Sequence, residues 1–142
     1  MRKNILNLCK TPTMLKGKSI TNIWIYLYEP FDNTNFSKFE ELDGDLYLEI
    51  NRELIIAFYP KTEDCSIEYE IVSLETLPVP LINVLSSSYW EQRTNIQIVK
   101  VECILEYLPI PAGIRIFFEN GIKTEIKYIS DDGNVFDSLQ IC

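Results

Sequence analysis

Apolar and polar residues alternate along most of this 142-residue chain, and a period of two is typical of β-strands with one buried face. The alternation predicts strands at 19–28, 45–50, 54–59, 66–72, 95–108, 114–119 and 122–129, with a last strand that ends near Ile141. Short helices are predicted at 35–42 and 80–85, and residues 1–18 form a basic N-terminal arm or short helix. We therefore predict a single mainly β domain over residues 1–142, with about seven or eight largely antiparallel strands and one or two short helices; an α+β fold is the alternative.

Both tight turns that join neighbouring strands are predicted to contain three residues rather than two. A two-residue turn would place the apolar residues of the paired strands on opposite faces, whereas a three-residue turn buries them together. This argument sets the loops at 51–53 and 119–121. The second loop ends in a glycine, which can adopt the left-handed conformation needed there, and its register places Arg115 opposite Glu125 on the outside.

Two strands carry more apolar residues than one buried face needs. The strand at 19–28 is apolar on both faces, so it is either central in its sheet or has its aromatic face covered by a helix. Its aromatic face includes Trp24, which, like Trp90, fits either the core or an interface. The strand at 95–108 is predicted to have one apolar face formed by Val99, Val101, Cys103, Leu105 and Tyr107.

The composition excludes several classes of catalytic and binding site. Ile occurs 20 times and Ala twice, which favours sheets over helices. The chain contains no His, which excludes Ser-His-Asp and Cys-His catalysis as well as His-ligated metal sites. A net charge of −8 argues against direct nucleic-acid binding. No apolar run reaches the roughly 20 residues of a membrane helix.

The spacing of the cysteines is evidence about the cellular compartment of the protein. Cys9, Cys65, Cys103 and Cys142 lie far apart in the sequence and form no C-x-x-C pair, so neither a zinc ribbon nor a redox dithiol is expected. The first residues lack the apolar stretch of a signal peptide. We therefore predict a cytoplasmic protein with reduced, partly buried thiols and with no metal or cofactor.

No motif in the chain predicts catalysis. Asp43-Gly44-Asp45 and Asp131-Asp132-Gly133 resemble parts of a calcium loop, but Tyr47 occupies the fifth position of the first one, and Asp-Gly pairs are common turn formers. Ser86-Ser87-Ser88 lacks the glycine frame of a nucleophile elbow. We expect no enzymatic activity and no catalytic residue.

Negative charge is concentrated in the first half of the predicted sheet. Residues 29–75 contain 13 acidic and 3 basic residues, a net charge of −10, and the rest of the chain sums to +2. Alternation directs acidic residues and tyrosines to the outward face, a composition that suits a protein-binding surface. A solvated face kept acidic for solubility is the simpler alternative. We predict that a basic protein partner binds Asp43, Asp45, Tyr47, Glu49, Tyr59, Glu68 and Glu70.

Two stretches give the chain a resemblance to a known class of proteins. Leu15-Lys16-Gly17-Lys18-Ser19-Ile20 leads into the first long strand, and the hairpin at 113–121 is followed by a strand and Asp131-Asp132-Gly133. In a small, acidic, His-free β-protein these stretches resemble the immunity proteins of bacterial polymorphic-toxin and contact-dependent growth-inhibition systems. The resemblance implies an inhibitor that binds one cognate toxin C-terminal domain, often a nuclease, and blocks its active site or its access to RNA or DNA. A nuclease groove is basic because it holds phosphates, so it would complement the acidic face.

Two other functions fit the same residues. One is a small-ligand-binding β-barrel or sandwich module with a cavity lined by Tyr and Trp, and a closed barrel with an empty apolar interior would identify it. The other is a carboxylate-dependent enzyme, which requires acidic residues that converge in a cleft.

Overall fold

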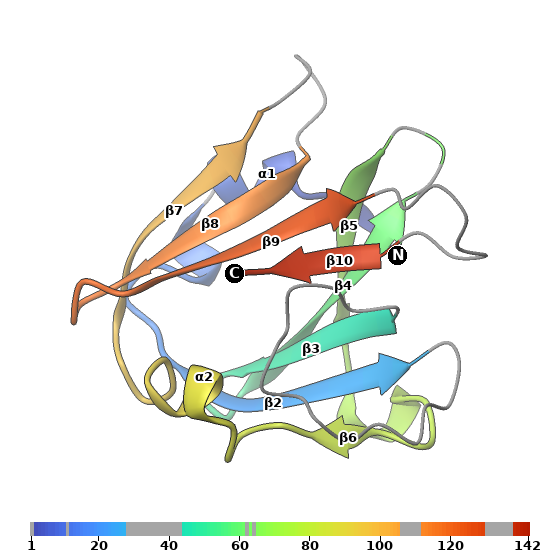
Figure 1. The fold of residues 1–142 in the computed structure, drawn as a ribbon, viewed down its shortest axis with the longest axis horizontal. Coiled ribbons are helices and arrows are strands. Elements are labelled where there is room, and N and C mark those ends of the chain that lie inside the picture. Colours follow the sequence, from blue (N-terminus) through green and yellow to red (C-terminus); the bar gives the residue numbers. More distant parts are fainter. Residues whose placement is uncertain are drawn as a thin grey trace.

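Two antiparallel β-sheets pack face to face to form the fold (Figure 1). The computed structural model describes residues 2–10, 12–27, 44–61, 63, 65–105, 112–129 and 138–142. The larger sheet has six strands in the order β1 (Lys3–Asn4), β5 (Ser66–Val72), β4 (Leu54–Lys61), β3 (Gly44–Ile50), β2 (Ile20–Leu27) and β6 (Ile82–Asn83). The smaller sheet has four strands in the order β10 (Ser138–Ile141), β9 (Lys123–Ile129), β8 (Gly113–Phe118) and β7 (Ile98–Ile104). The predicted mainly β, antiparallel fold is confirmed.

The helical segments of the described residues are short. They are α1 (Leu6–Lys10), η1 (Pro12–Met14), η3 (Leu74–Thr76) and α2 (Ser88–Glu91). The N-terminal arm predicted from the sequence thus contains a short helix, and α1 lies against β7 (Figure 1). None of the described helices is long and apolar enough to cross a membrane.

Both predicted hairpin registers are confirmed. Leu48 pairs with Ile56 across the loop between β3 and β4. Ile114 pairs with Ile126 across the loop between β8 and β9, where Gly121 adopts a φ of +85°. Each three-residue loop directs the apolar residues of both its strands toward the opposing sheet, as the burial argument requires.

The space between the sheets is filled by one hydrophobic core to which both sheets contribute. Its largest fully buried side chains are Trp90, Phe58 and Phe118. Trp90 is therefore a core residue, and its ring packs edge-on against Tyr89 with a centroid distance of 5.0 Å.

The long strand is shorter than predicted, and of its predicted apolar face Val101 is buried whereas Val99 is not. Its pairing with β8 shifts between Ile98 and Lys100, so Val99 is the extra residue of a β-bulge. Because the bulge reverses the alternation, Ile98 is buried and Val99 is 42% exposed. Leu105 lies beyond the strand and is exposed, and Tyr107 lies outside the described residues.

The predicted helix at 80–85 is wrong. This segment contains β6, which pairs with β2, and the helix α2 begins later. Ser87 is the N-cap of α2, and its hydroxyl accepts a hydrogen bond from the Trp90 backbone N–H at 3.3 Å. The serine cluster therefore begins a helix, because serine is a good capping residue. The predicted helix at 35–42 and the turn at 131–133 lie outside the described residues.

A disulfide joins the N-terminal arm to the smaller sheet. Cys9 in α1 bonds to Cys103 in β7, with the two Cα atoms 5.6 Å apart. The prediction of reduced thiols is therefore wrong for this pair. Cys65 and Cys142 are exposed and lie outside this disulfide. The sequence could not indicate the bond, because the two cysteines lie 94 positions apart and only the fold brings them together.

Candidate functional site

The predicted partner-binding residues lie on the face of the larger sheet that points away from the core. Six of the seven share this face, namely Asp45, Tyr47, Glu49, Tyr59, Glu68 and Glu70. Strand pairing aligns Tyr47 with Ala57 and Ala57 with Glu70, so the face runs continuously over β3, β4 and β5. Asp43 lies outside the described residues.

Part of this face is buried, although the alternation had suggested an exposed surface. Tyr47 is 3% exposed, Tyr59 6% and Asp45 8%. The two tyrosines belong to an outer cluster, separate from the core, that also contains Ile55, Ala57, Trp24, Tyr26, Val72, Leu77 and Leu81. Its last two members follow β5 in the chain, so the segment between β5 and β6 packs onto this face. Alternation shows which side of a sheet a residue faces, but not what another segment places over it.

The two tyrosines form an edge-to-face pair. The centroids of Tyr47 and Tyr59 are 6.5 Å apart with ring planes at 88°, and the Tyr59 hydroxyl donates to Oε2 of Glu70 at 3.1 Å. Burial and the nearby Asp45 carboxylate raise the pKa of Tyr47 to about 12. Burial, the interaction with Tyr47 and the bond to Glu70 hold the pKa of Tyr59 well above its ordinary value. Both phenols are therefore neutral at physiological pH.

Arg2 of the N-terminal arm lies on this face. The central carbon of its guanidinium is 3.7 Å from the centroid of the Tyr59 ring, and Nη1 is 3.0 Å from Oε1 of Glu68. The Glu68 side chain is only 17% exposed beneath it, whereas the Arg2 side chain is 51% exposed. Sequence reasoning missed this residue. The signal was present in the contrast between a basic arm and an acidic half-sheet, but the pairing of β1 with β5 is what brings the two together.

A shallow depression of about 410 Å³ opens beside the tyrosine pair. Tyr47, Tyr59 and Glu70 line it together with the end of β5, Ser73 and Thr76. The turn at this rim is closed by the Thr76 hydroxyl, which donates to the Ser73 carbonyl at 2.9 Å. The volume lies within the range of small-ligand and side-chain pockets.

Glu70 is the one described carboxylate that lines this depression. Partial burial acts to raise the pKa of Glu70. Hydrogen bonds, including that from Tyr59, and nearby positive charge, including that of Arg2, outweigh burial and hold the pKa below its ordinary value. Glu70 is therefore ionised at neutral pH and places a negative charge beside two aromatic rings. Glu49 makes a separate contact, because its Oε1 accepts a hydrogen bond from the Thr21 hydroxyl at 2.7 Å.

Three exposed carboxylates lie in the connections of the same strands but were not among the predicted site residues. Glu53 lies in the loop between β3 and β4, Glu63 between β4 and β5, and Glu75 in η3 directly after β5. Prediction from alternation missed them, since alternation assigns faces only within strands. Among the described acidic residues between 44 and 75, their exposure makes them the ones that a partner can reach most easily.

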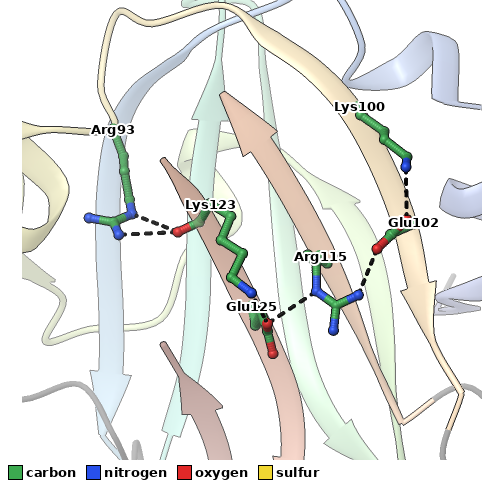
Figure 2. A network of polar contacts seen from close by, with 6 residues as sticks. All are labelled: Arg93, Lys100, Glu102, Arg115, Lys123 and Glu125. Atoms are coloured by element: carbon green, nitrogen blue, oxygen red, sulfur yellow. Dashed lines mark hydrogen bonds and ion pairs between the residues drawn. The ribbon is translucent and has the colours of Figure 1, made fainter. Parts of the chain in front are cut away.

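The outer face of the smaller sheet carries charges that pair with one another (Figure 2). The Arg115 guanidinium lies between two carboxylates, 2.6 Å from Oε1 of Glu102 and 3.1 Å from Oε1 of Glu125. Lys100 extends this ladder at 3.2 Å from Glu102, and Lys123 at 3.0 Å from Glu125. The predicted placement of Arg115 opposite Glu125 is confirmed.

The ladder lowers the pKa of both its carboxyls. Hydrogen bonds from Arg115 and Lys100 lower the pKa of Glu102. A hydrogen bond from Lys123, with a further one from Arg115, lowers the pKa of Glu125 against the opposing effect of partial burial. Positive and negative charges thus compensate each other on this sheet, in contrast to the acidic segment of the other.

The described part of the chain contains no group of three or more potential metal-ligating side chains. No protein-family model matches the sequence, and no curated protein or solved structure shows significant similarity to it.

Proposed function

We propose that this protein is an immunity protein that binds and neutralises a cognate toxin domain, a basic nuclease, through the acidic half of its larger sheet. In this proposal it is not an enzyme, needs no cofactor and binds neither nucleic acid nor membrane directly. The observation that carries the proposal is the net charge of −10 over residues 29–75, the part of the chain that contains the adjacent strands β3, β4 and β5. The ladder on the smaller sheet leaves no comparable excess there.

The electrostatics favour a basic protein as the partner. A nuclease must present a positively charged groove to hold phosphates, and an acidic surface competes for that groove while accelerating encounter. Because Tyr47, Tyr59 and Asp45 are buried, we assign first contact to the exposed Glu53 and Glu75. The half-buried Glu68 and Glu70 stay within the proposed interface.

The alternatives have less support. A barrel with an internal ligand needs an empty interior, whereas core side chains of both sheets fill the space between them. Hydrolysis by a carboxylate pair needs two convergent acids, whereas the depression is lined by Glu70 without a second described carboxylate. The depression itself fits a contact site for a partner's side chain.

The test begins with the gene next to this one. The proposal expects an upstream open reading frame that ends in a basic toxin domain. The purified toxin domain should bind this protein with an association rate constant of about 10⁸ M⁻¹s⁻¹ or more at low ionic strength. The rate should fall steeply as salt is added. A neighbour without such a domain, or a toxin that this protein neither binds nor neutralises, contradicts the proposal.

Matched charge reversals locate the interface. Glu53→Lys with Glu75→Lys should slow association at least about tenfold and weaken protection of cells that express the toxin. Glu91→Lys with Glu119→Lys changes the net charge equally at exposed positions outside residues 29–75, and it should have a much smaller effect. Equal slowing by both pairs would show that overall charge, and not the proposed face, steers the toxin.

The state of Cys9 and Cys103 tests the compartment. A nuclease is neutralised where it meets nucleic acid, which places the toxin and this protein in the cytoplasm. Protein disulfides, by contrast, persist in oxidising compartments. Thiols can be trapped with an alkylating reagent in intact cells. Labelling of all four cysteines supports the cytoplasmic location; labelling of Cys65 and Cys142 alone indicates a partner met in an oxidising compartment and a target other than nucleic acid.

A further inference from the structure

The N-terminal arm links an edge of each sheet. Its strand β1 stands at the end of the strand order of the larger sheet and pairs with β5. Its helix α1 lies against β7, which stands at the end of the strand order of the smaller sheet (Figure 1). The disulfide from Cys9 to Cys103 fixes α1 to β7. One short segment therefore lies beside an acidic strand at one end and is bonded covalently to the other sheet at its other end.

Arg2, directly before β1, covers a carboxylate of the acidic face. Its Nη1 is 3.0 Å from Oε1 of Glu68, and its guanidinium lies over the Tyr59 ring at 3.7 Å. The Arg2 side chain is 51% exposed, whereas the Glu68 side chain beneath it is 17% exposed. A basic group of a partner therefore meets Arg2 before it reaches Glu68, and the like charge of Arg2 repels it.

Apart from the disulfide, the arm is held by short elements. Both residues of β1 are exposed, and α1 has five residues, too few for a helix that is stable on its own. Ile5 and Leu8 anchor the arm in the core. Further along, Gly17 donates to Ile98 and Lys18 accepts from it, both at 2.8 Å, so the chain is fixed to β7 there in either state of the disulfide. Without the disulfide, β1 and α1 can open together as one unit that ends before Gly17.

The disulfide is accessible to a reductant, because Cys9 and Cys103 are both partly exposed. A dithiol reduces such a bond in two exchange steps. One thiolate of the dithiol attacks a protein sulfur, which forms a mixed disulfide and releases the other protein sulfur as a thiolate. The second thiolate of the dithiol then breaks the mixed disulfide. Two electrons pass to the protein, both cysteine sulfurs take up a proton, and the dithiol becomes a disulfide.

We propose that the arm is a redox-controlled cover of the acidic face: the disulfide holds Arg2 on Glu68, and reduction by a dithiol releases the arm and uncovers Glu68 for the basic partner. A longer tether holds Arg2 after reduction, so its effective concentration at Glu68 falls. A partner that binds the open form then binds more tightly, in proportion to the population of that form. The inference concerns regulation of the proposed interface and rests on the proposed function for the identity of the partner, but the movement of the arm can be tested without a toxin.

Carboxyl labelling measures the cover directly. The full chain is kept oxidised or is reduced with dithiothreitol, which is removed without oxygen before labelling with a water-soluble carbodiimide and glycine ethyl ester. Tandem mass spectrometry then locates the labelled glutamates. We expect Glu68 to be labelled at least about threefold faster after reduction, because the population of the open form rises.

Glu125 is the matched control for this experiment. Its side chain is 18% exposed and, like that of Glu68, it pairs with an arginine, but it lies on the other sheet. Its labelling should not change on reduction. Equal labelling of Glu68 in the oxidised and reduced protein would overturn the inference. An equal increase at Glu68 and Glu125 would overturn it too, because it would show a general loosening of the fold.

Variants test the cover and the disulfide separately. Arg2→Ala with the disulfide intact should raise the labelling of Glu68 to the level of the reduced protein, and unchanged labelling would show that Arg2 is not the cover. Cys9→Ala with Cys103→Ala should reproduce the reduced state. Cys65→Ser with Cys142→Ser should keep the response to dithiothreitol, since both residues lie outside the disulfide, and loss of the response would overturn the role of that bond.

Toxin binding separates the cover from the proposed function. If labelling changes as expected but no toxin is bound or neutralised, the immunity role fails and the cover stands. If a toxin is bound, the reduced protein should bind it at least about threefold more tightly than the oxidised protein. Equal affinity of the two forms would overturn the regulation and leave the immunity role intact.

Discussion

Removal of the disulfide between Cys9 and Cys103 should be among the most destabilising changes that leave the core intact. The bond closes a loop in which 94 positions separate its ends. Loop-closure entropy in the unfolded chain then corresponds to about 4–5 kcal/mol at 25 °C. A domain of 142 residues has an unfolding entropy of about 0.3 kcal/mol per kelvin near its midpoint, so the melting temperature should fall by about 15 °C.

The variant is Cys9→Ala with Cys103→Ala, compared with native protein by urea denaturation and by calorimetry. Alanine at both positions avoids leaving one partly buried thiol without its partner. Cys65→Ser with Cys142→Ser is the control, because both thiols are exposed, and it should change the free energy of unfolding by less than about 0.5 kcal/mol. Native protein purified without reductant should react with a thiol reagent at two sites, and at four after reduction and unfolding.

Two results would refute this reasoning. Four reactive thiols in the native, unreduced protein would show that the bond does not form in solution. A loss below about 1 kcal/mol on removal of a bond that does form would show that the unfolded chain does not gain the expected freedom.

Three further changes test the structure elsewhere. Because burial raises the pKa of Tyr47 above that of an unfolded tyrosine, the stability contributed by the neutral phenol should be complete below about pH 10 and fall as the pH rises toward 12. Phenolate absorbance followed alongside circular dichroism tests this expectation, and ionisation that precedes any loss of stability would contradict it. Gly44→Ala should lower the free energy of unfolding by about 3 kcal/mol, because the added Cβ would overlap the carbonyl oxygen of Tyr26. Gly121→Ala meets no neighbour and should cost only about 1 kcal/mol for its positive φ. Equal losses in chemical denaturation would argue against this pairing of β2 with β3. Arg115→Met should lower the free energy of unfolding by under about 1 kcal/mol at neutral pH. The difference from native protein should vanish on acidification, because the two glutamate partners, whose pKa values are lowered, then become protonated. A loss independent of pH would assign Arg115 a packing role.

The sequence alone determined the class of fold and the local pairing of strands. Alternation identified the long strands, and the need to bury both apolar sets fixed three-residue loops that pair Leu48 with Ile56 and Ile114 with Ile126. These features are local, because a register is set by residues a few positions apart and by one shared face. The same reasoning placed six of the seven predicted site residues on one face of the larger sheet.

Tertiary structure decided what covers each face and which distant residues meet. The segment after β5 and the side chain of Arg2 close over Tyr47 and Tyr59, so a face predicted to be open is half-buried. The bulge at Val99 leaves Val99 exposed and Ile98 buried at the start of β7, and folding brings Cys9 within bonding distance of Cys103. Such contacts depend on how whole elements pack over long sequence separations, and hydrophobic periodicity carries no information about them. The depression beside Tyr59 arises from the same packing, and for that reason only the folded chain reveals it.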